Sequence, residues 1–174
     1  MGADIHAFIE YRHRKEGSDL GGWDAFHQGE LSLGRHYLLF AALSGIRKPY
    51  DNFTELIPPR GLPDDAASDT FMALHYPIVE EANAPSYDIF NDWPHILRSQ
   101  VKPEFTVIRK GDYEYVREEG YHDHSYLSMD EIHACLEHAE LPLEKTDIWF
   151  QAAVAAMAKL DEHFETRLVF WFDN

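Results

Sequence analysis

The chain has 174 residues, enough for one domain that buries about two thirds of its unfolded surface without support from metals or disulfides. Its net charge of −16, from 15 Lys and Arg against 31 Asp and Glu, disfavours direct binding to DNA or RNA phosphates. Cys135 is the single cysteine and no apolar run approaches the ~20 residues that cross a bilayer, so we expect a cytoplasmic protein without disulfides or membrane contact.

The N-terminal stretch Gly2–Tyr11 alternates polar and apolar side chains, which predicts a strand with one packed face. Asp4 and His6 share the polar face, and residues two apart on a strand lie roughly 6.5–7 Å from each other. A carboxylate and an imidazole at this spacing can converge on one ion or one substrate group. The polar, glycine-containing segment that follows predicts a hairpin returning to a second strand near 23–26.

The segment 35–45 is apolar nearly all round and ends at Gly45, which predicts a buried helix. Four prolines between residues 46 and 65 then predict a stiff loop, which would hold Arg60 and the pair Asp64-Asp65 in defined positions. The acid pair could ligate magnesium, but capping of a following helix within 66–82 is the simpler interpretation.

Residues 77–120 differ in character from the rest of the chain and are interpreted as a chain-specific insertion. Within them, apolar-rich runs at 104–108 and 113–116 flank the turn sequence Lys110-Gly111-Asp112. This arrangement predicts a β-hairpin.

The C-terminal third begins with Ser128-Met129-Asp130-Glu131, a capping box that predicts a helix over 129–138 with Cys135 on its packed face. Thr146 is expected to cap the next helix. The final stretch 166–174 is apolar on both faces, as a central strand is.

These elements predict an α+β fold in one domain spanning 1–174. The N- and C-terminal strands would lie centrally and adjacent in a mixed sheet, covered by about three helices that begin near residues 35, 129 and 147. Adjacency of the terminal strands would bring either Asp173 or Arg167 near Asp4 and His6.

Two pairs at spacing two, Asp4-x-His6 and His122-x-His124, supply three imidazoles and a carboxylate if both pairs are extended. Such a set suits zinc, manganese or iron, and the ion would polarise a phosphoryl oxygen or activate water. The competing interpretation is structural, with His6 satisfied in the core and the second pair on a solvated loop.

The same groups also allow chemistry without a metal. His6, His122 and His124 could act as general acid and base with Asp4 orienting one ring, while Arg60 binds an anionic group through two hydrogen bonds. Ser125 is adjacent to a histidine, but neighbouring residues in a strand face opposite ways, which disfavours a serine hydrolase.

Five short motifs recur in a group of proteins; they are Met1–His6, Gly34–Tyr37, Pro59–Asp65, His124–Ser128 and Val169–Asn174. Together they resemble a family of small proteins from tailed bacteriophages and prophages, whose members begin Met-Gly-Cys-Asp-Ile-His. Ala3 stands where the family has cysteine, which leaves Asp4 and His6 as the stronger candidates. The resemblance implies a phage or prophage origin, a bacterial host cytoplasm and a shared site, without an assigned activity.

The leading hypothesis is therefore a phage accessory enzyme, a metal- or histidine-dependent phosphoesterase or nucleotide-processing protein that acts on a small anionic substrate. The alternative is a non-catalytic acidic protein that inhibits a host protein or sequesters a small ligand. An inhibitor of a basic groove would present its carboxylates as one face, whereas an enzyme would keep imidazoles and Arg60 in a pocket. A structural virion role is the weakest of the three, because no repeat or assembly arm is present.

Overall fold

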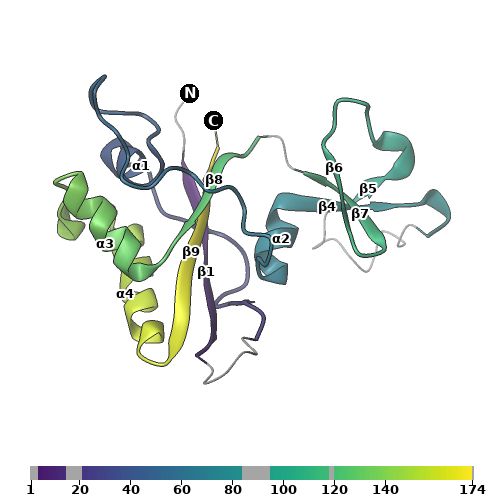
Figure 1. Cartoon of the computed structure of the whole chain (residues 1–174). Helices are drawn as coiled ribbons and strands as arrows, with labels where there is room; N and C mark the ends of the chain where they lie inside the picture. The colour runs from purple at the N-terminus through teal and green to yellow at the C-terminus, as the bar shows by residue number, and fades with distance from the viewer. Residues whose placement is uncertain (1–3, 15–20, 84–94, 118–119, 174) are drawn as a thin grey trace. The chain divides into compact units, whose positions relative to one another are not determined.

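A computed structural model describes residues 4–14, 21–83, 95–117 and 120–173 of the chain (Figure 1). It has an α+β fold with two sheets and two compact units. The terminal unit comprises residues 1–70 and 121–174, and the insert unit comprises residues 71–120.

The terminal unit is built on a five-stranded sheet of order β2-β1-β9-β8, with β3 also paired to β1. Its strands are β1 (Ile5–His13), β2 (Asp24–Ala25), β3 (Leu31–Ser32), β8 (His122–Leu127) and β9 (Phe164–Phe172). The two long strands β1 and β9 pair antiparallel over their full length, from Ile5 opposite Phe172 to His13 opposite Phe164. The prediction that the terminal strands lie centrally and adjacent is confirmed.

Three helices lie on one side of this sheet (Figure 1). They are α1 (Tyr37–Ser44), α3 (Met129–His138) and α4 (Ile148–Asp161), and a short 3-10 turn η3 (Leu143–Lys145) precedes α4. A fourth, α2 (Ser68–Leu74), crosses the boundary between the units.

The helix ends follow local sequence. Gly45 closes α1 with a positive φ of 69° and donates its N–H to Ala41, as a helix C-cap does. Ser128 and Glu131 form the expected capping box at α3. The predicted cap of the next helix is wrong by one residue: Asp147 caps α4, while the Thr146 hydroxyl donates to the Leu143 carbonyl.

The core lies between the sheet and these helices. From the sheet it takes the alternate residues Ile5, Ala7, Ile9, Leu168, Phe170 and Phe172, all buried. Cys135 is buried there too, in agreement with a structural role. The opposite face of the same strands carries His6, Glu10 and Arg167, so alternation along β1 and β9 separates the packing face from a polar one.

The insert unit is a four-stranded mixed sheet of order β5-β4-β7-β6. Its elements are β4 (His75–Val79), η1 (Glu81–Asn83), β5 (Ile96–Leu97), η2 (Arg98–Gln100), β6 (Val107–Lys110) and β7 (Tyr113–Arg117). The predicted hairpin is present as β6 and β7, with Lys110 opposite Tyr113 across a turn at Gly111. Of the helix predicted within 66–82, the structure has α2 and the start of the 3-10 turn η1. Pro77 lies between them in strand β4, because the residue before a proline is disfavoured in the helical conformation.

Among the described residues, no helix is long and apolar enough to cross a membrane.

Candidate functional site

His6 is the centre of the candidate site, because both of its ring nitrogens lie against carboxylates. Nε2 is 3.1 Å from Oδ2 of Asp173, the residue that follows β9. Nδ1 is 3.0 Å from Oε1 of Glu30, the residue that precedes β3. The side chain of His6 is only 14% exposed, so these contacts are partly shielded from water.

The two carboxylates are held differently. Asp173 is fixed to the start of β1, since its Oδ1 accepts the Asp4 N–H at 2.7 Å and its own N–H donates to the Asp4 carbonyl at 3.2 Å. The Glu30 side chain, as exposed as that of Asp173 (33% against 34%), lies 3.0 Å from His6 Nδ1 but has no such backbone contact among the described residues. Asp173 therefore orients the ring, whereas Glu30 is the contact that an incoming group displaces more easily.

The charges favour a protonated ring. Glu30 raises the pKa of His6 most strongly; partial burial opposes this, and Asp173 adds to the increase, so the pKa lies above its ordinary value of 6.5. Burial alone would raise the pKa of Asp173, but the Asp4 N–H and the neighbouring His6 together lower it below 3.8. The pair is thus stabilised as imidazolium and carboxylate.

Aromatic rings surround His6 on this face. Its ring centroid is 5.5 Å from that of Tyr121 and 6.4 Å from that of Trp171, to which it is nearly parallel. Trp171 lies on β9 between β1 and β8, and the His124 ring lies 6.4 Å from it on the β8 side. Trp171 is fully buried, and its Nε1 has no hydrogen-bond partner among the described residues.

The structure places the four predicted metal ligands among different partners. Arg35 binds the Asp4 carboxylate with two hydrogen bonds of 2.9 Å, and His6 contacts Asp173 and Glu30 as above. His122 Nδ1 lies 2.6 Å from its neighbour Asp123. In the described ranges no three His, Cys, Asp or Glu side chains form a group placed to hold a metal ion.

A β-bulge explains why the second histidine pair does not share one face. The register between β8 and β9 shifts between His122 and Ser125, and Asp123 has a positive φ of 49°. As a result His122 stacks on Phe172, whereas His124 stacks on Trp171. Successive residues of a strand face opposite ways, so the two imidazoles lie toward opposite faces of the sheet.

Arg60 lies beside β8, away from His6. Its N–H donates to the Ser125 hydroxyl at 3.2 Å, and the next N–H, of Gly61, donates to the His124 carbonyl at 2.9 Å. Its guanidinium makes two hydrogen bonds to Glu131 of α3, which raises the pKa of Arg60 further. The Arg60 guanidinium, which was expected to bind an anionic group, is therefore already paired with a carboxylate of the same chain.

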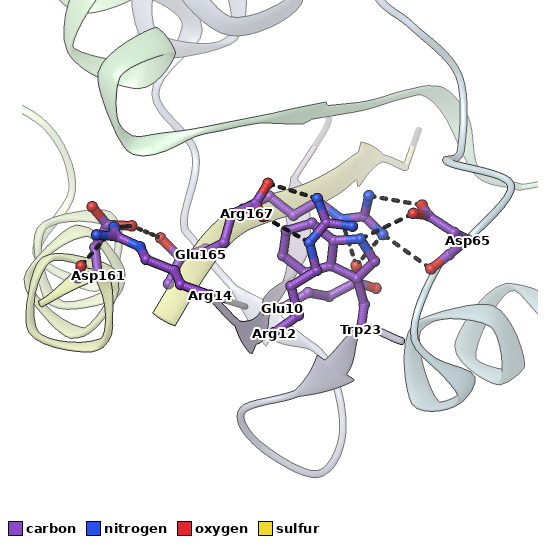
Figure 2. Close-up of polar contacts among 9 residues, drawn as sticks. Glu10, Arg12, Arg14, Trp23, Asp65, Asp161, Glu165 and Arg167 are labelled. Carbon is purple, nitrogen blue, oxygen red and sulfur yellow. Dashed lines mark hydrogen bonds and ion pairs between the residues drawn. The ribbon is translucent and has the colours of Figure 1, made fainter. Parts of the chain in front are cut away.

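Arg60 also lines a pocket of about 210 Å³ with a second set of ion pairs. Arg167 donates to Glu10 at 2.7 Å and to Asp65 at 2.8 Å, and Arg12 donates twice to Glu165 at 2.8 Å (Figure 2). Every arginine of the pocket faces a carboxylate, so the pocket carries no excess positive charge.

This arginine network holds the 60–67 loop on the polar face of the sheet. Asp65 accepts from Arg167 and, at 3.0 Å, from Nε1 of Trp23, whose ring lies 3.9 Å from the Arg167 guanidinium carbon. The Ala67 N–H donates to the buried Glu10 at 2.8 Å. Asp65 thus anchors the loop to β9, a role different from the helix cap expected of it.

Comparison with known protein families, curated proteins and solved structures gave no match, so the functional argument rests on the geometry of this site.

Sequence reasoning found His6 and one of its carboxylates but missed three neighbours. Trp171 could have been found from the sequence, since antiparallel pairing of β9 with β1 places it opposite His6. Glu30 and Tyr121 precede short or irregular strands and have no periodic signal. Of the two residues expected near Asp4 and His6, Asp173 is there, whereas Arg167 lies opposite Glu10.

Proposed function

We propose that this protein is a histidine-dependent phosphoesterase or nucleotide-processing enzyme, in which His6 transfers a proton to or from a small anionic substrate. The observation that carries the proposal is the difference between the two carboxylates at the His6 ring, with Asp173 held at Nε2 by the Asp4 backbone and Glu30 opposite Nδ1 without such a contact among the described residues. An orienting carboxylate on one nitrogen and a displaceable contact on the other is the arrangement that general acid–base catalysis by histidine requires.

The charge of the site supports an anionic substrate in one specific place. A phosphoryl oxygen that replaces Glu30 beside the imidazolium exchanges one negative charge for another, so the ring keeps its counter-ion. Tyr121 adds an aromatic wall against the His6 ring.

In hydrolysis of a phosphoester, water would attack phosphorus, and the bond to the leaving alcohol would break as the new P–O bond forms. His6, protonated because of its raised pKa, would donate its Nδ1 proton to the leaving oxygen. The attacking water would keep one proton as the new P–OH group and release the other to solvent, and neutral His6 would take up a proton from solvent to complete the cycle. Asp173 would stabilise the ring orientation throughout.

The placement of the side chains favours proton transfer over metal binding. In the described ranges no three His, Cys, Asp or Glu side chains are placed to hold a metal ion, and Asp4 already binds Arg35. We therefore favour the metal-independent form of the enzyme.

The test is hydrolysis of a panel of aryl phosphates, nucleoside monophosphates and cyclic nucleotides by the full chain, with and without a chelator. His6→Gln should lower kcat at least about 100-fold. His163→Gln is the matched control, because His163 is 70% exposed and should leave turnover unchanged. Loss of activity in chelator would refute the metal-independent form. Binding of a nucleotide without turnover would instead support a protein that sequesters a small ligand.

A further inference from the structure

The turn that carries Glu30 to the His6 ring is anchored to β1 by a second histidine, His27. The Ile9 N–H donates to Nε2 of His27 at 3.2 Å, and Nδ1 of the same ring lies 2.8 Å from the Gly29 carbonyl. Because Nε2 accepts a hydrogen bond, the ring proton lies on Nδ1, which donates to Gly29. The neutral ring thus uses both of its nitrogens to join the turn to the strand.

The His27 ring completes the hydrogen-bonding ladder along one edge of β1. This strand pairs with β2 through residues 10 and 11 and with β3 through residues 6 and 7. Between the two pairings the Ile9 carbonyl accepts from the Phe26 N–H at 2.8 Å, whereas the Ile9 N–H donates to the His27 ring instead of a backbone carbonyl. The imidazole therefore holds the chain on β1 where it passes from β2 to β3.

Glu30 lies between this anchor and β3. On its C-terminal side Leu31 begins β3, which pairs with β1, and on its N-terminal side Gly29 accepts from His27. Gly29 has a positive φ of 73°, a conformation that glycine adopts without strain. With the backbone held on both sides, the Glu30 carboxylate lies 3.0 Å from Nδ1 of His6.

Stacked rings also connect His27 with the candidate site. Its ring centroid lies 5.2 Å from that of Phe8, with 11° between the two planes. The Phe8 ring lies 6.0 Å from that of Trp171, which in turn is nearly parallel to the His6 ring. Phe8 and Trp171 are buried, so His27 stacks on a rigid surface. Stacking and hydrogen bonds together fix the imidazole in one orientation.

We propose that His27 is a positioning residue, which holds the 26–30 turn on β1 and thereby holds Glu30 at Nδ1 of His6. The inference rests on the proposed function and deepens it, because Glu30 occupies the place that a phosphoryl oxygen of the substrate would take. The anchor then determines how readily Glu30 leaves that place. His27 acts through Glu30 and need not contact the substrate.

The position of the His27 ring proton is tested in the unchanged full chain. Ring nitrogen-15 chemical shifts near neutral pH should place the proton on Nδ1, with the signals assigned by their loss in His27→Phe. The Ile9 amide hydrogen should exchange with solvent at least about tenfold more slowly than in the unfolded chain. A proton on Nε2, or an Ile9 amide without protection, would overturn the anchor even if no variant folds.

Loss of the anchor is tested in His27→Phe, which keeps a ring against Phe8 but removes both hydrogen bonds. The nuclear Overhauser effect between the His6 ring and the Glu30 side chain should fall at least about twofold, because the turn opens more often. The effect between the His6 and Tyr121 rings, 5.5 Å apart, should persist and reports that the site is folded. An unchanged effect between His6 and Glu30 would overturn the proposal.

His13→Phe is the matched control. His13 lies at the other end of β1 and contacts the ring of Phe164 edge-on at 5.1 Å, so the same replacement there should leave both Overhauser effects unchanged. An equal loss in both variants would contradict a specific role for His27. These measurements need no substrate, so absence of turnover would refute the proposed function alone, whereas an unanchored Glu30 would refute this inference alone.

Discussion

Replacing Arg167 with methionine should destabilise the terminal unit far more than loss of an ordinary ion pair. Arg167 is 6% exposed and lies opposite Glu10, which is 0% exposed, across the β1–β9 pair. The 2.7 Å hydrogen bond between them neutralises a carboxylate that has no access to water. In Arg167→Met that charge stays buried, and among the described residues only the Ala67 N–H still donates to Glu10.

The magnitude follows from this burial. Removing one partner of a buried ion pair costs about 3–5 kcal/mol, because the remaining charge is uncompensated. Arg167→Met also removes the stacking of the guanidinium on Trp23, although this contribution overlaps with the first. We expect a loss of about 4 kcal/mol, a large share of the 5–15 kcal/mol typical of a folded domain.

Urea unfolding followed by far-ultraviolet circular dichroism measures this loss. The control is Arg14→Met, since Arg14 is also paired, with Asp161 at 3.1 Å, but is 55% exposed. That control should lose less than about 1 kcal/mol. Adding Glu10→Gln to Arg167→Met removes the stranded charge and should recover part of the stability. A cost for Arg167→Met no larger than that of the control would refute the reasoning.

Three further measurements test other parts of the structure. His6→Gln should lower the free energy of unfolding most between about pH 3.8 and 6.5, where Asp173 is ionised and His6 is charged. This loss should vanish as pH rises through the raised pKa of His6, and urea unfolding at several pH values measures it. Gly45→Ala should lower the unfolding free energy by about 1–2 kcal/mol, because φ is +69° and a Cβ would meet the Glu55 carboxylate; thermal unfolding measures it. Burial raises the pKa of Cys135 to about 11, so the native thiol should react with an aromatic disulfide reagent much more slowly than the unfolded chain; equal rates would contradict its burial.

Long elements with a regular pattern were predictable from the sequence. The alternation in β1 indicates which of its faces is packed, and the apolar run of β9 indicates that this strand is buried on both faces. Together they indicate that the two strands are central in the sheet. Caps are equally local: Gly45 and the Ser128 capping box determine their helix ends through residues at most three positions away.

The site was only half predictable, because half of it depends on long-range register. Glu30 reaches His6 through β3, a strand of two residues that is too short to show alternation. The separation of His122 from His124 depends on a bulge at Asp123, a residue type that tolerates positive φ but does not require it. Spacing two in the sequence therefore did not translate into a shared face.

The arginine network and the histidine site lie on the same face of the same pair of strands, and this links them physically. A slip of one residue between β1 and β9 would reverse the faces and separate Glu10 from Arg167 as well as His6 from Trp171. Because Glu10 is fully buried, the slipped state would leave its charge unpaired, at a cost that few alternatives can offset. The buried ion pair and the contact between Asp173 and the His6 ring thus require the same register of β1 and β9, so an energetic penalty on slipping at one end protects the geometry at the other.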